Sequence, residues 1–427
     1  MKILVKQAVI ADPNSPFNGQ VTDILVEGTK IVQISKNITA KADEVLDAHE
    51  MIVSPGFVDI FSNFCDPGFE HRETLESGAA AAAAGGFTHV FVIPNTQPVT
   101  DSKSQVAYIC QKSKSLPVTI CPLGAITKGT EGKDLAEMYD MKQSGAIAFS
   151  DGNNPVQSPG LFLKALQYVR ALDGVLVQIP LDKSIGAGGL MNEGIISTRL
   201  GLPGIPSLAE EIIIKRDIDL LRYTQSKLHI TAVSTANGLA LIEAAKKEGL
   251  QISCSVTPYH LFFCDEDLQT YDTNLKLNPP LRSRADMLAL REAVLNGVVD
   301  CIAAHHMPQD WDNKTCEFEY AKNGMTGLET SFAVVNHLLP ELKKERLVNL
   351  FSLNARNIFN LPVTSIQENA HADLTIFTQE GITCINKAAL KTKSPNTAFL
   401  DRELNGRVLG IIHKGNLIQN QNQGYEN

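Results

Sequence analysis

Short apolar runs alternate with helical patterns through the middle of the chain. Eight runs rich in β-branched residues recur at residues 57–61, 88–93, 118–123, 146–150, 175–179, 228–233, 252–256 and 299–304. Helical patterns lie between them, at 74–84, 161–172, 208–224, 238–247 and 284–296. Runs apolar enough to be buried on both faces are typical of a parallel sheet covered by helices. The pattern predicts an α/β fold with a TIM-like (β/α)8 barrel. A doubly wound open sheet is the alternative, although no G-x-G-x-x-G segment follows the first run.

Both ends of the chain have a different pattern. Residues 2–10, 21–26 and 30–34 alternate in the manner of strands separated by turns, and residues 372–377, 407–413 and 416–419 repeat it near the other end. The simplest interpretation is a small β-sandwich domain assembled from both termini. We therefore expect a composite domain of residues 1–54 and 363–427 beside a barrel of residues 55–362.

Composition and charge exclude several classes of protein. With 44% hydrophobic and 20% charged residues, the chain is globular and not disordered. Acidic residues outnumber basic ones, 47 to 38, so a nucleic-acid-binding role is not expected. No apolar run reaches the roughly 20 residues of a membrane span, and the opening segment turns polar too early for a secretion signal. Eight cysteines without a C-x-x-C pair predict reduced thiols in a cytoplasmic protein.

In a barrel of this kind, function is expected where the strands end. The first run begins in PGFVD (55–59), and further motifs follow in order: EHRET (70–74), AAAGGFT (82–88), IPNT (93–96), GLMNEG (189–194), LGLPGIP (200–206), NPPLR (278–282) and GLET (327–330). This series resembles the dihydroorotases of the amidohydrolase superfamily, in the long form found with multifunctional pyrimidine enzymes. The resemblance covers nearly the whole chain. It implies an amidohydrolase barrel that uses zinc to open or close a cyclic amide.

Nearly every zinc-ligand position that the resemblance implies has changed. The family's His-x-His pair falls on Phe61 and Asn63, and its strand-five and strand-six histidines fall on Ile179 and Ala232. The acidic ligand of strand four is present as Asp151, whereas the strand-eight aspartate is replaced by His305. Catalytic zinc needs about three protein ligands and an open position. We therefore expect no metal here, unless His260 or His229 is recruited.

Loss of zinc would remove most of the chemistry. Zinc-bound water has a pKa of about 7, against about 15.7 for free water. At about 1.36 kcal/mol per pKa unit, hydroxide then becomes costlier by roughly 12 kcal/mol. General-base help from His305 would return only about 10²–10⁴-fold, or roughly 3–5 kcal/mol. No intact catalytic set is therefore predicted.

The substrate contacts that the resemblance implies are half retained. Asn95 and Asn278 match two of them, although asparagine in these positions also suits turn capping. The family's carboxylate-binding arginine falls on Cys65, and a further histidine falls on Gln309. The single tryptophan, Trp311, is interpreted as a half-buried aromatic, with an anchor for a partner as the alternative.

Three functions follow from these residues. The first is a dihydroorotase homologue of pyrimidine biosynthesis that has lost zinc and hydrolysis and serves as a structural or regulatory partner. The resemblance suggests aspartate carbamoyltransferase as that partner, and a homodimer. The second is an active dihydroorotase or other cyclic amidohydrolase with a site rebuilt around Asp151, His305 and His306. The third is a non-catalytic sensor of a pyrimidine intermediate that keeps Asn95 and Asn278.

Overall fold

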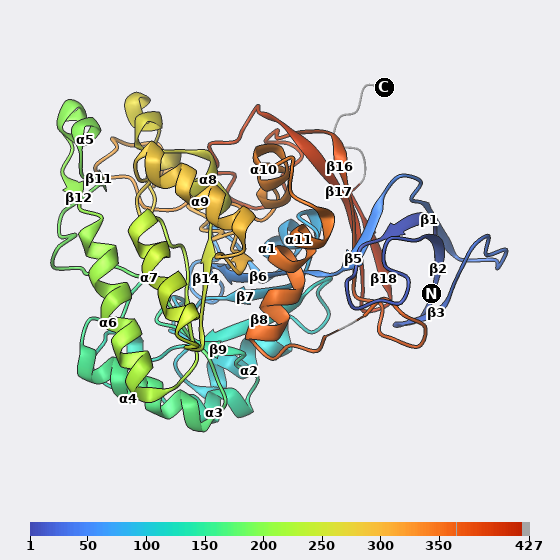
Figure 1. Ribbon diagram of the computed structural model, residues 1–427, viewed down its shortest axis with the longest axis horizontal. Coiled ribbons are helices and arrows are strands. Elements are labelled where there is room, and N and C mark those ends of the chain that lie inside the picture. The colour runs from blue at the N-terminus through green and yellow to red at the C-terminus, as the bar shows by residue number, and fades with distance from the viewer. Residues whose placement is uncertain (364, 421–427) are drawn as a thin grey trace.

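Two sheets organise the chain in the computed structural model, which describes residues 1–363 and 365–420 (Figure 1). The central sheet has eight strands in the order β15-β14-β13-β10-β9-β8-β7-β6, and all of its pairings are parallel. A parallel bridge between Ser62 and His306 joins the first strand to the segment after the last. The predicted α/β barrel is therefore confirmed, and the open sheet is not.

The barrel strands fall on the eight apolar runs of the sequence. Their bounds are β6 Phe57–Ser62, β7 Phe87–Val92, β8 Thr119–Gly124, β9 Ala148–Phe149, β10 Leu176–Gln178, β13 Leu228–Ile230, β14 Ile252–Val256 and β15 Cys301–Ile302. Apolar side chains fill the barrel interior, including those of Phe61, Phe91, Val177 and Ile179. A larger apolar cluster lies between the strands and the surrounding helices.

Helices cover the outside of the barrel. The longer ones are α1 Leu75–Ala84, α2 Lys103–Lys112, α4 Pro159–Ala171, α6 Leu208–Thr224, α7 Ala236–Lys247, α9 Arg284–Asn296 and α10 Ser331–Leu338. Shorter ones are α3 Met138–Gln143, α5 Ile195–Leu200, α8 Pro258–Phe262, α11 Lys344–Val348 and α12 Asn354–Ile358. Side-chain oxygens cap the first turns of several helices, as Thr74 does for α1 and Ser283 for α9. In the part of the chain that the structure describes, no helix is long and apolar enough to cross a membrane.

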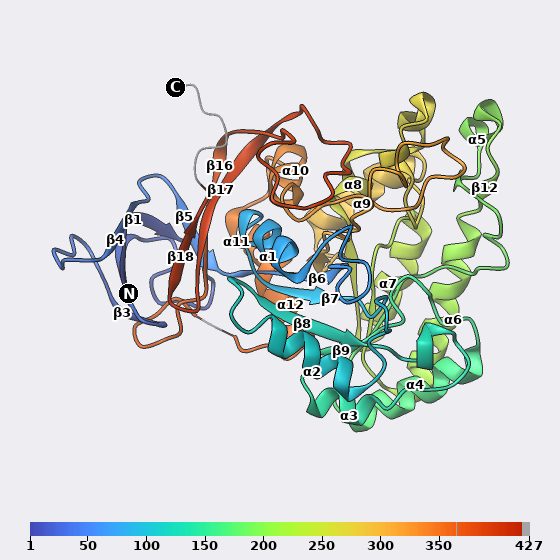
Figure 2. The same ribbon diagram turned by 180° about the vertical axis from the view of Figure 1, so that it is seen from behind.

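Strands from both termini form the second sheet, which lies to one side of the barrel (Figures 1 and 2). Its order is β18-β17-β16-β5-β1-β2-β3, with β4 also paired to β1. The bounds are β1 Lys2–Ile10, β2 Val21–Glu27, β3 Lys30–Ser35, β4 Glu44–Asp47, β5 Ile52–Pro55, β16 Leu374–Cys384, β17 Glu403–His413 and β18 Asn416–Gln419. The antiparallel pair of β5 and β16 joins the two ends of the chain. The sheet is continuous and mixed, and its two halves share one apolar core. The exact domain bounds stay a prediction, and residues 421–427 lie outside the described part.

The hairpin of β16 and β17 also reaches the barrel. β17 packs against α10 and α1, and the connection between the two hairpin strands, residues 385–402, extends over the ends of β6 and β15. The small domain therefore contributes backbone and side chains to the face on which the barrel strands end.

Candidate functional site

The ends of β6 and β15 are joined by a buried carboxylate. Asp59, from the PGFVD motif, accepts hydrogen bonds from the backbone N–H of Ala304 at 2.6 Å and from the Ser62 hydroxyl at 2.6 Å. The backbone N–H of Asn63 donates to the carbonyl of His306 at 2.8 Å. These bonds hold the end of β6, with Phe61 and Asn63, beside residues 304–306. Asp59 of the PGFVD motif thus fixes the end of β6 against the segment that follows β15.

At Phe61, where the resemblance would place the family's first histidine, an aromatic ring covers His305. The rings of Phe61 and His305 stack with their centroids 4.3 Å apart and their planes 19° apart. The Nε2 atom of His305 lies 2.7 Å from the Thr231 hydroxyl. Burial, together with the neighbouring His260 and His229, holds the pKa of His305 well below its usual range. The imidazole is therefore neutral at physiological pH, with one nitrogen bonded to protein and one face covered by a phenyl ring.

Asp151, which the resemblance implies as an acidic ligand, is bonded to the protein through both oxygens. Its Oδ1 accepts from the backbone N–H groups of Ile126 at 2.8 Å and Thr127 at 2.9 Å, and its Oδ2 accepts from the Thr127 hydroxyl. Burial raises the pKa of Asp151 to about 6, although these hydrogen bonds oppose the rise. The carboxylate shapes the loop after β8.

The remaining ligand positions offer little to a cation. Ile179 and Ala232 are buried, and Ile179 belongs to the same apolar cluster as Phe61. The Asn63 side-chain oxygen accepts from the backbone N–H of Cys65 at 2.9 Å. Among the described residues, no group of three or more histidine, cysteine or acidic side chains is placed to hold a metal ion.

The histidines that could be recruited are also bonded to protein. His229 contacts the hydroxyls of Ser253 and Ser255 at 2.8 and 3.0 Å, and His260 contacts Thr257 and the Pro279 carbonyl. Burial lowers the pKa of His229 to about 3 and that of His260 to about 4. The structure does not bring Asp151, His305 and His306 together as a metal-binding group. The donor set therefore does not fit the zinc site that the resemblance implies.

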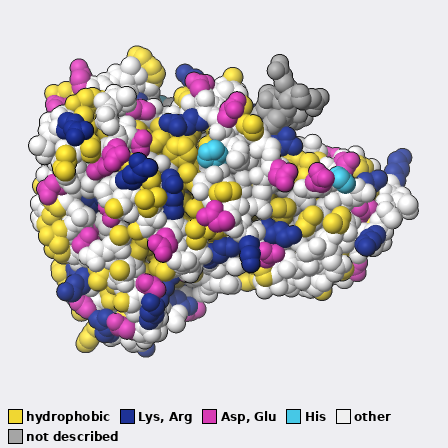
Figure 3. All heavy atoms as spheres, turned by 45° about the horizontal axis from the view of Figure 1, so that its top comes forward, with side chains coloured by type: hydrophobic (Ala, Val, Ile, Leu, Met, Phe, Trp, Pro, Cys, Tyr) yellow, Lys and Arg dark blue, Asp and Glu magenta, His cyan; other side chains and the backbone are white. Residues whose placement is uncertain are grey.

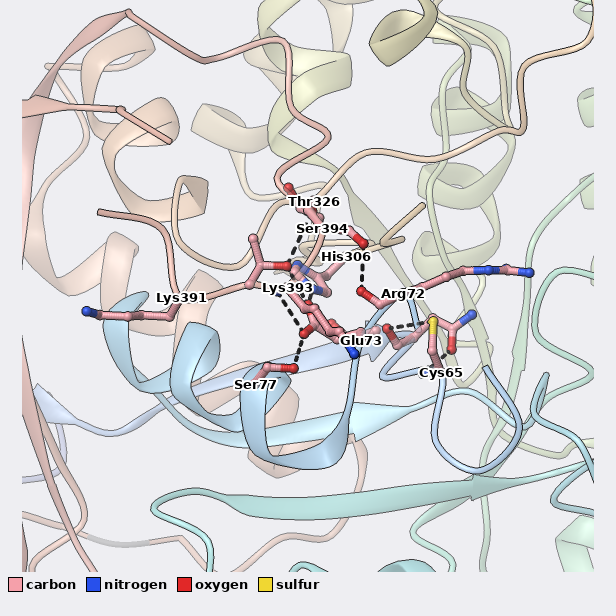
Figure 4. Close-up of polar contacts among 12 residues, drawn as sticks. Cys65, Arg72, Glu73, Ser77, His306, Thr326, Lys391, Lys393 and Ser394 are labelled. Carbon is pink, nitrogen blue, oxygen red and sulfur yellow. Dashed lines mark hydrogen bonds and ion pairs between the residues drawn. The ribbon is translucent and has the colours of Figure 1, made fainter. Parts of the chain in front are cut away.

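His306 belongs instead to a buried polar cluster, which Figure 4 shows. Its Nε2 lies 3.3 Å from the Glu73 carboxylate, and its Nδ1 accepts from the backbone N–H of Gly327 at 3.3 Å. Glu73 also accepts from the Thr392 hydroxyl and from the backbone N–H of Lys393. The EHRET motif of the sequence gives no sign of this role of Glu73. Its partners at 392–393 lie too far along the chain for spacing to reveal them.

The implied substrate positions are used in different ways. The Asn95 amide donates to the Asp151 carbonyl at 3.1 Å and accepts from the backbone N–H of Asn153 at 2.9 Å, which supports the turn-capping interpretation. Asn278 is half-buried. Cys65 is fully buried, and burial raises the pKa of its thiol to about 12. Gln309 donates to the Asn323 carbonyl, while its Oε1 is buried with no hydrogen-bond partner in the described structure.

A hollow of about 490 Å³ opens beside Gln309, on the face where the strands end. Its lining includes Gln309, Trp311, Lys314, Lys387, Lys393 and Asn396. Trp311 is 71% exposed at its rim, so the expectation of a half-buried aromatic was wrong. Phe61, Asp151 and His305 do not line this hollow.

Comparison with known proteins gives consistent matches. A family model described as "Dihydro-orotase-like" matches residues 50–238. A protein of Syntrophus aciditrophicus (strain SB) named "Dihydroorotase" is 38% identical over 423 residues, which cover 98% of this chain and 99% of that protein. A "Dihydroorotase" of Pelotomaculum thermopropionicum is 39% identical, with 98% of each chain covered. Among solved structures, the L-hydantoinase of Arthrobacter aurescens superposes with a TM-score of 0.86 at 23% identity, covering 98% of this chain and 96% of that one. The last match concerns the fold alone.

Proposed function

The chain belongs to the dihydroorotase-like family of the amidohydrolase superfamily, and we propose that it nevertheless neither holds the zinc that the resemblance implies nor hydrolyses dihydroorotate. It retains the family barrel, while the positions that would hold the metal serve packing and loop geometry. In this proposal the protein has a structural or regulatory role in pyrimidine biosynthesis.

The stacking of Phe61 on His305 carries this proposal. A catalytic zinc site keeps about three ligands and an open coordination position. Here a phenyl ring with no lone pair lies 4.3 Å from the imidazole that stands at the strand-eight ligand position. Ile179 lies in the same apolar cluster as Phe61, and Ala232 is also buried, so neither position leaves a polar side chain without a partner.

We further propose that the protein acts as a homodimer and as a partner of aspartate carbamoyltransferase. This part rests on the family resemblance and on the loss of the zinc site that we propose above. Sedimentation of the protein alone, and then mixed with aspartate carbamoyltransferase, tests it. A dimer that co-sediments with the second enzyme is expected. A monomer that does not co-sediment with aspartate carbamoyltransferase would refute both the dimer and the partner role.

A working dihydroorotase is the second candidate. The names of the curated relatives favour it, since proteins 36–41% identical to this chain carry the name "Dihydroorotase". Hydrolysis by this chain would require a donor arrangement different from the described one, with His305 released from Thr231 and Asp151 from Thr127. The comparisons support this candidate better than the loss of activity, and the side-chain geometry supports the first proposal better.

Metal content and turnover, measured on one sample, separate the two candidates. The protein is dialysed against zinc-containing buffer and analysed for zinc, and dihydroorotate hydrolysis is assayed beside the Syntrophus aciditrophicus relative. We expect zinc well below one equivalent and no turnover. Near-stoichiometric zinc with turnover that disappears in His305→Ala would refute the proposal. Turnover that His305→Ala leaves unchanged would point to contamination by another hydrolase, and the zinc content would then decide.

A further inference from the structure

We propose that the hollow beside Gln309 binds a nucleoside monophosphate, with the base on Trp311 and the phosphate on Lys387 and Lys393. The hollow of about 490 Å³ falls within the range of about 300–1,000 Å³ that is usual for small-molecule sites. None of the metal-ligand positions lines it. The inference therefore does not depend on whether the chain is a hydrolase.

The charge of the lining selects an anion. Lys314, Lys387 and Lys393 contribute to it, in a chain whose net charge is −9. The one carboxylate in the lining, Asp310, already lies 3.3 Å from the Nε2 atom of His71. Basic and acidic side chains are interspersed over the face seen in Figure 3. Burial lowers the pKa of Lys314 to about 7, so Lys387 and Lys393 are the cations that give the hollow its positive charge.

The lysines are not equally available. The Lys314 ammonium donates to the carbonyls of Thr273 and Lys322, both at 2.8 Å, and thereby fixes the wall of the hollow. The Lys393 ammonium donates to the Glu70 carbonyl at 2.6 Å and keeps two further donor positions. Within the described residues, the Lys387 ammonium has no hydrogen bond or ion pair. Lys387 is therefore the cation most free to meet a phosphate.

The ring of Trp311 provides a platform for a base. The turn that carries it is well defined, because the Trp311 carbonyl accepts from the backbone N–H groups of Lys314 and Thr315 at 3.0 and 2.8 Å. Asp310 accepts from the backbone and side-chain nitrogens of Asn313 and closes the same turn. Stacking of a base on an exposed aromatic ring is favourable and tolerant of base identity. A tryptophan that is 71% exposed, on a turn held by backbone hydrogen bonds and beside two lysines, suits a ligand with both a ring and an anionic group.

One acceptor at the hollow has no partner. The side-chain Oε1 of Gln309 is buried without a hydrogen bond in the described structure, and Gln309 lines the hollow. A buried acceptor without a partner is costly. Because this oxygen is buried, an N–H or O–H group of a ligand would reach it only if the amide turned and its bond to the Asn323 carbonyl broke. Asn396 cannot do so, because its own amide is bonded to Met307, Gly324 and the backbone of Gln309.

Fluorescence titration of the native protein tests the inference directly, because Trp311 is the only tryptophan in the chain. The probes are uridine monophosphate, uridine and inorganic phosphate. We expect saturable quenching by uridine monophosphate and about tenfold weaker binding of uridine, since the phosphate contacts are lost. Phosphate should compete with the nucleotide without quenching. No quenching at millimolar nucleotide would overturn the proposal. Equal binding of phosphate and nucleotide, measured by calorimetry, would also overturn it, because it would reduce the site to one for simple anions.

Two variants separate the parts of the site. Lys387→Gln should weaken uridine monophosphate binding about tenfold and leave uridine unaffected. Lys164→Gln, an exposed lysine on α4 that does not line the hollow, is the matched control and should change neither. Trp311→Leu, followed by calorimetry, should bring nucleotide affinity down to that of phosphate. Equal effects of the two lysine variants would contradict the assignment.

Discussion

Replacement of Phe61 by alanine tests whether the strand ends are packed. The side chain is fully buried, lies in the apolar cluster of the barrel interior and stacks on His305. Truncation of a buried phenylalanine costs about 3–5 kcal/mol, because burial is lost and a cavity remains. An aromatic pair contributes about 0.5–1.5 kcal/mol of such a cost beyond the buried area. We therefore expect Phe61→Ala to lower the free energy of unfolding by about 3–5 kcal/mol.

Urea unfolding, followed by circular dichroism and by Trp311 fluorescence, measures this loss. Tyr223→Ala is the control, because Tyr223 is 74% exposed on α6 and its truncation should cost less than about 0.5 kcal/mol. A further variant, Phe61→His, returns an imidazole to the position. It should also destabilise, since the ring nitrogens lack partners there, and added zinc should not restore stability. A loss below about 1 kcal/mol in Phe61→Ala would refute the packed site. If zinc restored the stability of Phe61→His, the conclusion that the side chains around residue 61 cannot bind zinc would be refuted.

Three further predictions concern buried carboxylates and metal. Burial raises the pKa of Asp151 from 3.8 to about 6, so the folded state binds more protons than the unfolded state between these pH values. The contribution of Asp151 to the free energy of unfolding should therefore fall as pH rises from about 4 to about 6. Asp151→Asn should remove this fall from a plot of unfolding free energy against pH. Glu210 accepts from the backbone N–H groups of Ser234 and Thr235 and pairs with buried Arg282 at 3.4 Å, so Glu210→Ala should cost about 3–5 kcal/mol in urea unfolding, and a cost under about 1 kcal/mol would contradict the pairing. Zinc added to the wild-type protein should leave the midpoint of thermal unfolding unchanged, because a ligand that does not bind the folded state cannot stabilise it; a saturable rise would contradict this.

Much of the fold was predictable because the barrel strands are marked by local composition. Runs such as 57–61 and 252–256 are apolar enough to require burial on both faces, and the structure places β6 and β14 there. The joining of both termini in one small β domain was also predicted from strand patterns at the two ends. The exposure of Trp311 was not, because a single aromatic in a polar loop carries no periodic signal.

The sequence by itself determined which functional groups stand at the positions where the resemblance implies zinc ligands. Phe61, Ile179 and Ala232 have no lone pair to offer a cation in any fold, and this follows from their side chains alone. The order of motifs along the chain also indicates the family, without any knowledge of the fold.

The tertiary structure decided what the remaining polar groups do. His305, Asp151 and Asn95 could each have served a ligand, and only the folded chain shows them bonded to Thr231, Thr127 and Asn153. It alone brings Thr392 to Glu73, which lies 319 residues earlier. Hydrogen bonds depend on distances of a few ångströms between segments remote in sequence, and local patterns carry no information on such distances.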